Sequence, residues 1–295
     1  MPNKLSKLLV ISGPTASGKT AFAIEIAKKY NGVLIAADSR TVYKYMDIGT
    51  GKELNYPHKL INIVRPDQTL TLADYKKKAV AAIRAAARAG KLPILVGGTG
   101  LYIWAIVDNL LIPKVAANEK MRRELQKKTS EELFNILNSI DPSAAKVTGK
   151  NKRRIIRALE VVAGSGEKFS ESTKKGKPLF DFLEIGLALP REELVKRIDK
   201  RVDEMIKTGF MAEVLKLRKK LFFPDLPAMS GIGYKELNDV IDGNMIMSDA
   251  VSRIKARTRQ YARRQMTWFR RDKRIHWILG LGEADLLVKS WLEAE

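Results

Sequence analysis

Short apolar runs alternate with helical stretches through the first third of the chain. The runs at 7–12, 33–37 and 93–96 are mostly continuous instead of alternating with polar residues. That pattern is typical of strands buried on both faces of a parallel sheet. Helix formers dominate the stretches between and after the runs, and we expect helices at 20–30, 73–89 and 101–107. This order predicts a doubly wound α/β sheet, whose ligands bind at the carboxyl ends of its strands.

The pattern changes from residue 113 onward. Helical spacing recurs in three segments joined by short polar turns, at 118–128, 130–138 and 152–163, and no convincing strand lies between them. A Gly-, Ser- and Lys-rich stretch at 165–178 then predicts a mobile loop. The apolar run at 182–189 restores a strand. We therefore expect a core formed by 1–112 and 181–295 and a mainly helical insertion at 113–180.

A basic helix is expected near the C-terminus. Ser248-Asp249 would form its N-cap, and residues at three- and four-residue spacing would form its packing stripe: Val251, Ile254, Thr258, Tyr261, Gln265 and Trp268. Many Lys and Arg side chains lie beside this stripe, and the only acid in the segment is Asp249. A solvated helix normally mixes charges of both signs. Such a helix favours contact with phosphates, which would supply the missing anions.

Composition supports a polyanionic partner and excludes several kinds of site. The 295 residues are 45% hydrophobic, enough for a large core, and 54 Lys and Arg against 33 Asp and Glu give a net charge of +21. The alternative is an enzyme from a proteome that is basic throughout. The chain has no Cys, which excludes disulfides and thiolate chemistry, and its two His are too far apart in sequence to indicate a metal cluster. No apolar run of membrane-spanning length occurs, and residues 1–5 lead directly into the first strand, so we expect a cytoplasmic protein.

The strongest short signal follows the first expected strand. It reads Gly13, Pro14, Thr15, Ala16, Ser17, Gly18, Lys19 and Thr20. Between a strand and a helix this is a phosphate-binding loop, in which glycines turn backbone N–H groups toward an anion. Lys19 adds a positive charge, and the Thr20 hydroxyl can bind Mg²⁺. The loop predicts a P-loop NTPase-like core, and leaves open whether a nucleoside triphosphate or another diphosphate binds there.

Two further strand ends carry polar groups. Asp38 follows the second expected strand, and in a doubly wound fold this end faces the phosphate-binding loop. Its carboxylate could accept a proton from a nucleophile; equally, it could cap the next turn or hold a magnesium-bound water. Gly97 to Gly100 follows the third strand and adds the hydroxyl of Thr99, which by itself is a weak indication of a site.

The motifs in combination resemble the tRNA dimethylallyltransferase family. Beyond the phosphate-binding loop, the matching blocks are Asp38-Ser39-x-x-x-Tyr43 with Met46 to Thr50, Gly97 to Tyr102, Arg157 to Val161, Gly231 to Tyr234, and Thr258 to Trp268. They cover nearly the full chain in the family's order. The resemblance implies transfer of a dimethylallyl group from dimethylallyl diphosphate to N6 of the adenosine 3′ of the anticodon in tRNA. It also implies that the loop holds a prenyl diphosphate with Mg²⁺, and we expect a monomer that binds the anticodon stem-loop.

The same resemblance assigns roles to individual residues. Asp38 would be the general base, Thr99 would lie beside the adenosine, and Lys19 with Thr20 and Mg²⁺ would stabilise the departing diphosphate. The residues implied to contact tRNA are Asp38, Ser39, Arg40, Thr41, Thr99, Asn118, Arg153, Arg154, Arg259, Arg263, Arg264 and Gln265. One departure occurs at Lys150-Asn151, where relatives often have Asn-Asp, and it weakens the assignments at 150–154.

Three other functions stay open at this point. The phosphate-binding loop alone favours an ATP-dependent small-molecule kinase, which the basic C-terminal helix disfavours. An RNA-binding protein without catalysis is disfavoured by the intact Lys19, Thr20 and Asp38. An enzyme that prenylates free adenine nucleotides would not need the insertion or the basic helix.

Overall fold

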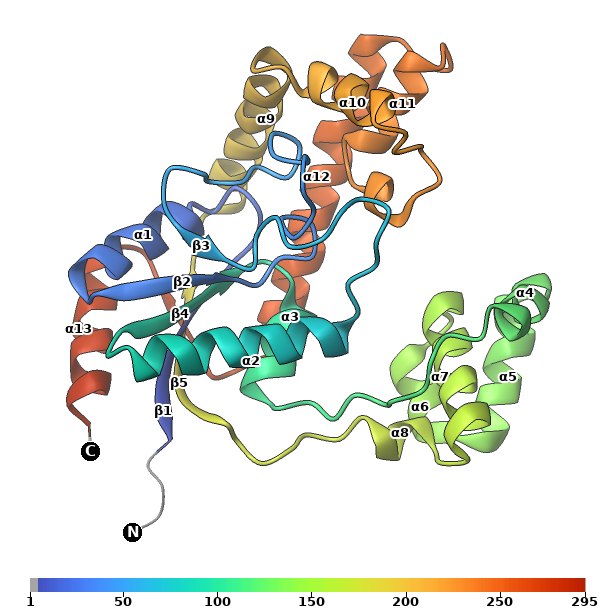
Figure 1. The fold of residues 1–295 in the computed structure, drawn as a ribbon, viewed down its shortest axis with the longest axis horizontal. Coiled ribbons are helices and arrows are strands. Elements are labelled where there is room, and N and C mark those ends of the chain that lie inside the picture. Colours follow the sequence, from blue (N-terminus) through green and yellow to red (C-terminus); the bar gives the residue numbers. More distant parts are fainter. Residues whose placement is uncertain (1–4, 295) are drawn as a thin grey trace. The chain divides into compact units, whose positions relative to one another are not determined.

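The computed structural model describes residues 5–294 and divides the chain into two compact units. One unit comprises the chain up to Val107 and from Leu179 onward, and the other is Asp108–Pro178 (Figure 1). The sequence placed the insertion at 113–180, slightly later at each end. Residues 108–112 belong to the inserted unit because they pair with its last residues: the Leu111 amide donates to the Lys174 carbonyl at 2.9 Å.

The core is a six-stranded parallel sheet in the order β3-β2-β4-β1-β5-β6. Its strands are β1 (Ser6–Ser12), β2 (Gly32–Ala36), β3 (His58–Lys59), β4 (Leu92–Gly97), β5 (Phe180–Leu187) and β6 (Ile275–Ile278). The α/β class predicted from the apolar runs is confirmed. The two edge strands were not predicted, because β3 has two residues and β6 alternates polar and apolar positions too briefly to stand out.

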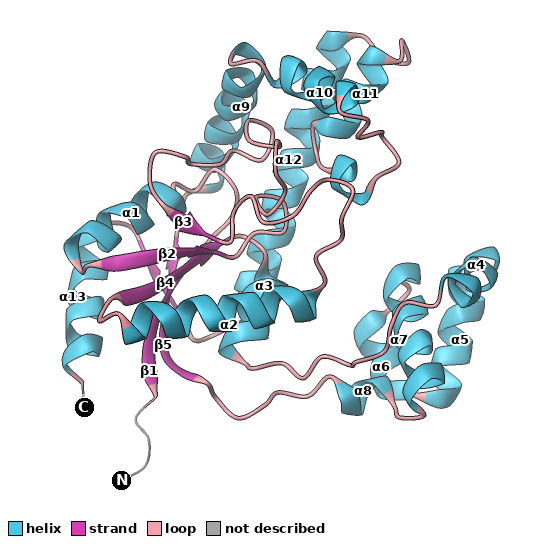
Figure 2. Ribbon diagram, viewed as in Figure 1, coloured by secondary structure: helices cyan, strands magenta, loops and turns pink. Residues whose placement is uncertain are grey.

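Helices cover both faces of this sheet (Figure 2). The helices of this unit are α1 (Lys19–Lys29), α2 (Leu72–Arg88), α3 (Gly100–Val107), α9 (Arg191–Lys207), α10 (Phe210–Lys219), η1 (Pro227–Ser230), α11 (Tyr234–Ile241), α12 (Met247–Phe269) and α13 (Leu281–Glu293). Of these, α1 and α13 pack on one face and α2 and α3 on the other. Alternate residues of β1 serve the two layers. Leu9 and Ile11 pack with α1 and α13, while Leu8 and Val10 pack with α2 and α3. This is the period-2 geometry of a strand buried on both sides.

A third apolar cluster lies beyond the carboxyl ends of the strands. It joins α9, α10, α11 and α12 to the loop that follows β2, with Met46, Phe210 and Tyr234 almost fully buried. The helix α12 begins at Met247 without a side-chain cap, so the predicted Ser248-Asp249 cap is wrong and both residues lie in the first turn. Its fully buried residues are Ala250, Ile254, Ala262, Gln265 and Phe269. Small residues thus bring this helix close to its neighbours, and much of the predicted stripe is only partly buried.

The inserted unit is entirely helical in its described residues. It contains α4 (Glu119–Lys127), α5 (Ser130–Ile140), α6 (Pro142–Thr148), α7 (Lys152–Ser165) and α8 (Phe169–Ser172), packed around a small core of its own. The stretch expected as a mobile loop includes α8. Its Lys177 carbonyl also accepts a hydrogen bond from the Asn109 side chain at 2.8 Å.

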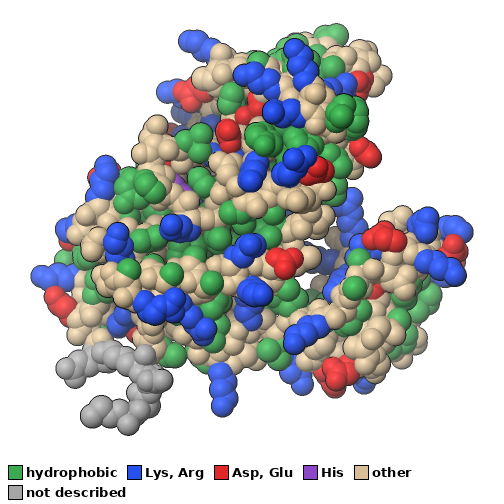
Figure 3. Space-filling view, in the orientation of Figure 1, with side chains coloured by type: hydrophobic (Ala, Val, Ile, Leu, Met, Phe, Trp, Pro, Cys, Tyr) green, Lys and Arg blue, Asp and Glu red, His purple; other side chains and the backbone are tan. Residues whose placement is uncertain are grey.

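Positive charge is widespread on the surface. In Figure 3, Lys and Arg side chains are spread over the face shown, with fewer acidic side chains between them. No helix within residues 5–294 combines the length and the apolar character needed to cross a membrane. The expectation that residues 1–5 lead directly into the first strand concerns residues that mostly lie outside the described range.

Candidate active site

The phosphate-binding loop joins β1 to α1 as predicted. Gly18 lies in the left-handed region at φ 87° and forms the N-cap of α1, a conformation that favours glycine. The loop therefore ends at a helix N-terminus whose first N–H groups have no intrahelical partner and can bind an anion. The Lys19 ammonium returns to the loop and donates to the Pro14 carbonyl at 3.1 Å.

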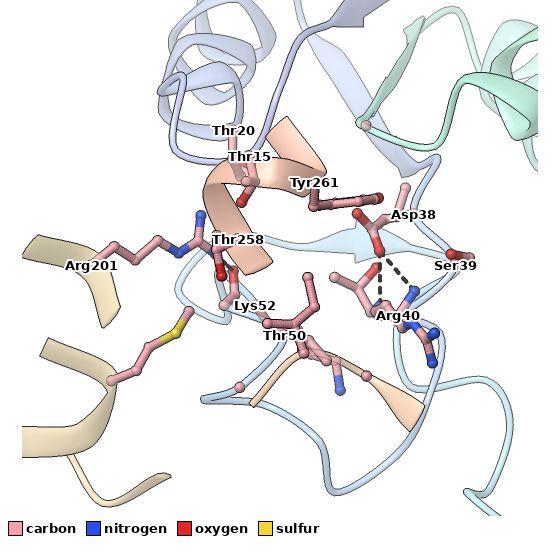
Figure 4. A pocket seen from close by; sticks show the side chains of 18 of the residues that line it. Thr15, Thr20, Asp38, Ser39, Arg40, Thr50, Lys52, Arg201, Thr258 and Tyr261 are labelled. Atoms are coloured by element: carbon pink, nitrogen blue, oxygen red, sulfur yellow. Dashed lines mark hydrogen bonds between the residues drawn. The ribbon is translucent and has the colours of Figure 1, made fainter. Parts of the chain in front are cut away.

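A cavity of about 390 Å³ opens beside this loop. Its lining includes the phosphate-binding loop, the ends of β2 and β4, the loop at 49–53, the segment 230–234, α9 and α12. Figure 4 shows that Thr15 and Thr20 approach it from the loop, Arg201 from α9, and Tyr261 from α12 next to Asp38. Residues far apart in sequence thus meet at the carboxyl ends of the parallel strands, as expected for this fold.

Asp38 is held by the turn that it begins. One carboxylate oxygen, Oδ1, accepts hydrogen bonds from the amides of Arg40 at 2.7 Å and Thr41 at 3.3 Å. The carboxylate therefore caps its own turn and also lines the cavity. The two roles considered from the sequence are compatible, because one oxygen is enough for the turn.

Thr99 lies behind the cavity wall and is absent from the residues that line it. Its Oγ1 accepts from the Ser39 amide at 3.0 Å, and its side chain also bonds to Tyr261. Burial, reinforced by the nearby Asp38 carboxylate, raises the pKa of Tyr261 to about 12. Thr99 thus ties the ends of β2 and β4 to α12. Arg40 lines the cavity, and its guanidinium donates to the Pro227 carbonyl at 3.3 Å.

The cavity carries two partly buried cations. Burial lowers the pKa of Lys19 to about 8; the Asp38 carboxylate opposes this effect and Arg201 adds to it. Burial also lowers the pKa of Arg201, again opposed by Asp38. Sequence reasoning missed Arg201, although its position beside the apolar stripe of Ile198 and Val202 could have indicated a half-buried charge.

Gln265 connects two of the strand-end loops. Its Oε1 accepts from the Thr15 amide at 2.9 Å, and its Nε2 donates to the Gly98 carbonyl at 2.7 Å. A Cβ at Gly98 would lie 2.3 Å from Nε2, so a larger residue there would displace the Gln265 amide. Gln265 and Tyr261 are four residues apart and share one face of α12. The amide of Gln265 is therefore engaged within the protein, at a position that also lines the cavity.

Comparison with known proteins shows the family. The family model described as IPP transferase matches residues 41–272, and the model described as isopentenyl transferase matches residues 6–65. The chain is 43% identical over 287 residues to the tRNA dimethylallyltransferase of Pelotomaculum thermopropionicum, covering 94% of this chain and 91% of the relative. It is 42% identical to that of Acetivibrio thermocellus, covering 93% and 92%.

The chain belongs to the tRNA dimethylallyltransferase family. It is therefore an enzyme of the prenyltransferase class. Its structure is similar to the tRNA isopentenylpyrophosphate transferase of Bacillus halodurans, with a TM-score of 0.72, 35% identity, and coverage of 97% of this chain and 95% of the other. A eukaryotic dimethylallyltransferase solved while acting on tRNA gives a TM-score of 0.74 at 31% identity, covering 89% of this chain and 69% of the other.

The charges on α12 of this tRNA dimethylallyltransferase family member are partly neutralised. The expectation that they lack acidic partners is wrong for the middle of the helix, because α9 and α11 supply carboxylates. Lys255 pairs with Asp203 at 2.7 Å, Arg259 with Asp199 at 2.8 Å, and Arg257 with Glu236. The Arg259 guanidinium, inferred as a tRNA contact, is thus engaged by α9.

The basic side chains in the C-terminal half of α12 are not neutralised in this way. Arg263, Arg264, Arg270 and Arg271 are exposed, and no ion pair to them occurs within the described part of the chain. Arg264 lies 5.9 Å from the ring centroid of Tyr261, which lines the cavity. The cationic surface therefore begins at the cavity edge and continues along the end of the helix.

Three residues of the inserted unit were expected to contact tRNA, and the structure describes their positions within that unit. Asn118 is the N-cap of α4 and accepts from the Met121 amide at 3.0 Å, while Arg153 and Arg154 are exposed in the first turn of α7. The departure at 150–151 has a structural role, because Asn151 caps α7 by accepting from the Arg154 amide at 3.2 Å. Lys150 pairs with Glu131 at 2.8 Å.

Proposed function

We propose that the chain transfers the dimethylallyl group of dimethylallyl diphosphate to N6 of the adenosine 3′ of the anticodon in tRNA and releases diphosphate. The observation that supports this most directly is that Lys19 and Arg201, which can bind an anion, line the same cavity as the carboxylate of Asp38. An enzyme of this family needs those two functions in one place, because the leaving group is anionic and the acceptor must lose a proton.

The donor's diphosphate would bind at the phosphate-binding loop. The N–H groups at the start of α1, Lys19 and Arg201 converge there, and both cations are desolvated. An anion restores the electrostatic stabilisation that these partly buried cations lack in its absence. The same donors would stabilise the negative charge that develops as the carbon–oxygen bond of the donor breaks. Ser17 Oγ, buried without a partner among residues 5–294, is a further donor for this ligand.

The proposal includes Mg²⁺ bound with the diphosphate. Mg²⁺ usually keeps several waters and takes few protein ligands besides phosphate oxygens, so a single hydroxyl is sufficient. Thr20 supplies that hydroxyl at the cavity wall. The described residues contain no cluster of three or more acidic, His or Cys ligands, which fits a metal held mainly by its substrate. When bound, Mg²⁺ would neutralise charge on the leaving group.

The acceptor amine would face Asp38. The lone pair of an exocyclic amine is delocalised into the purine ring, so attack is assisted when a base removes the amine proton. In the proposed step, N6 forms a bond to the donor's C1, the C1–oxygen bond breaks, and the N6 proton passes to Asp38. The turn hydrogen bonds to Oδ1 keep this carboxylate oriented toward the cavity. Ser39 and Thr41 line the same wall and would surround the base.

The tRNA backbone would contact the cationic surfaces. A base stacked in the anticodon loop cannot reach a cavity, so it must be extruded, and the phosphates around it need partners. Arg264 is at the cavity edge and Arg263 is exposed next to it on α12, while Asn118, Arg153 and Arg154 offer a second set on the insertion. The proposal also takes the enzyme to be a monomer acting in the cytoplasm; size-exclusion chromatography with light scattering tests the first point.

The decisive experiment uses labelled dimethylallyl diphosphate. We expect label to enter unmodified tRNA in the presence of Mg²⁺ and to be lost when EDTA is added or when Asp38 is replaced by Asn. Free AMP and ATP serve as alternative substrates. Transfer of label to AMP with none to tRNA would identify an adenine-nucleotide prenyltransferase, and ATP-dependent phosphorylation without prenyl transfer would identify a kinase.

A further inference from the structure

Glu213 is a buried carboxylate that no part of the proposed chemistry uses. It lies in the first turn of α10 and is 9% exposed. Within residues 5–294 it forms no ion pair with Lys or Arg. Burial lowers the pKa of the nearby Lys52, and Asp47 and Glu213 oppose that shift. Burying a carboxylate in this way is costly unless hydrogen bonds compensate for the lost hydration.

Backbone amides supply that compensation. Oε2 accepts from the amides of Asp47 and Ile48, each at 2.7 Å, and Oε1 accepts from the Gly49 amide at 3.1 Å. The Tyr234 hydroxyl also donates to Oε1, at 2.6 Å. Three successive amides that converge on one anion form a nest, and the hydrogen bonds of a charged acceptor are stronger than neutral ones. One side chain thus fixes the start of the loop 47–52.

The other side of this loop supports Arg201. Gly51 packs directly under the guanidinium, because a Cβ there would lie 1.6 Å from Arg201 Nη2. The same Nη2 donates to the Gly51 carbonyl at 3.4 Å. At Gly49 a Cβ would come within 2.2 Å of the Phe210 ring. The loop is therefore packed between α10 and Arg201 with no room to shift.

The far end of the loop is also fixed. The Lys52 ammonium, fully buried, donates to the Tyr43 carbonyl at 2.5 Å, to Asp47 Oδ1 at 2.7 Å and to Asn62 Oδ1 at 2.6 Å. Its three donors are fully used, so it is not available to a ligand. Of the cations around this loop, Arg201 is the one whose head faces Lys19 and Asp38.

We infer that Glu213 is a positioning residue: it holds the loop 47–52 in the conformation that places the Arg201 guanidinium against the donor's diphosphate. This inference rests on the proposed function for the identity of the ligand. Through the loop, a carboxylate that never touches substrate sets the geometry of the leaving-group site.

The test is a double-mutant cycle on anion binding, with Glu213→Gln and Arg201→Ala and inorganic diphosphate as the probe. The uncharged Gln retains the shape of Glu but presents an NH₂ group to donors, so the loop should loosen. We expect Glu213→Gln to weaken diphosphate binding about tenfold. In the Arg201→Ala background the same change should weaken it less than about twofold, because coupled residues are non-additive.

Amide hydrogen exchange at 47–49 measures the clamp directly and needs no ligand. It should accelerate in Glu213→Gln while exchange in the central strands is unchanged. Asp141→Asn is the matched control, since Asp141 is also buried and accepts backbone amides, from Ala144 at 3.0 Å and Ser170 at 2.8 Å, but lies in the inserted unit. It should change neither exchange at 47–49 nor diphosphate affinity. Tyr234→Phe removes one donor and provides a milder variant should Glu213→Gln not fold.

Additive effects of the two substitutions, or unchanged exchange at 47–49, would overturn the inference. Failure of the proposed function looks different. In that case label from dimethylallyl diphosphate would not enter tRNA, while the exchange measurement would still report whether Glu213 holds the loop.

Discussion

Raising the pH from 7 to 9 should weaken diphosphate binding, because Lys19 loses its charge in this range. Burial lowers the pKa of its ammonium from 10.5 to about 8, with Asp38 opposing the shift and Arg201 adding to it. At that pKa, Lys19 is about nine-tenths protonated at pH 7 and about one-tenth protonated at pH 9. If only the charged form binds the anion well, affinity should fall about tenfold across the range.

Isothermal titration calorimetry with inorganic diphosphate measures this change. Diphosphate itself titrates, so the reference is Lys19→Arg, whose guanidinium keeps its charge throughout. The ratio of the two affinities isolates the contribution of Lys19. Titrations at pH 8.5 in two buffers of different ionisation enthalpy should also show that the wild type takes up a proton on binding and that Lys19→Arg takes up less.

Stability of the ligand-free protein should respond in the opposite direction. The folded-state pKa of Lys19 is below its unfolded value, so the unfolded chain binds more protons between about pH 8 and pH 10.5. Relative to Lys19→Met, the wild-type free energy of unfolding should therefore rise with pH through that window. Parallel pH profiles of diphosphate binding in the wild type and Lys19→Arg would refute the assignment of a depressed pKa to Lys19.

Three further substitutions test separate parts of the site. Asp38→Asn keeps a side-chain oxygen that can accept the turn hydrogen bonds, so tRNA affinity should persist. The kcat should fall roughly 10²-fold or more, and an unchanged kcat would show that Asp38 is not the general base. Replacing Arg263 and Arg264 by Ala should reduce the salt dependence of tRNA binding by about 0.7 per lost phosphate contact, measured by filter binding against Arg88→Ala on α2; identical slopes would place the RNA elsewhere. Gln265→Leu leaves two buried backbone groups unpaired, so it should lower stability by about 1–3 kcal/mol in thermal unfolding and raise the donor KM. Gln265→Glu retains the acceptor oxygen, so its stability and donor KM should lie between those of the wild type and Gln265→Leu. An unchanged donor KM in both variants would show that Gln265 does not position the loop.

The central layer of the fold could be predicted because its signals are local. The strands β1, β2 and β4 are continuous apolar runs, and the phosphate-binding loop has a fixed spacing between one strand and one helix. The edge strands could not be predicted, since β3 is specified by pairing with β2 and not by a pattern of its own. The cap of α12 was misplaced for a related reason: tertiary packing of Ala250 and Ile254 overrides the local preference of Ser248 and Asp249.

Site residues could be predicted from the sequence where they directly follow a strand. They were missed where the packing of a distant helix brings them to the cavity. Asp38 follows a strand, so topology alone places it at the cavity. Arg201 reaches the same cavity from a helix more than 150 residues away, and its position beside Ile198 and Val202 indicates partial burial but not the site that it faces. Gln265 was predicted from its motif, but its contacts within the protein were not. Its motif indicated a functional residue, but only the structure shows that its amide is turned inward to Thr15 and Gly98.

The inserted unit leaves and re-enters the core through two segments that are hydrogen-bonded to each other. Leu111 pairs with Lys174, and the Gly176 amide donates to the Asp108 carbonyl at 3.2 Å. The beginning and end of the unit are therefore adjacent, as in domains that tolerate transplantation. Because the segment 108–178 also has its own apolar core, a short linker could replace it between α3 and β5 without disrupting the core unit.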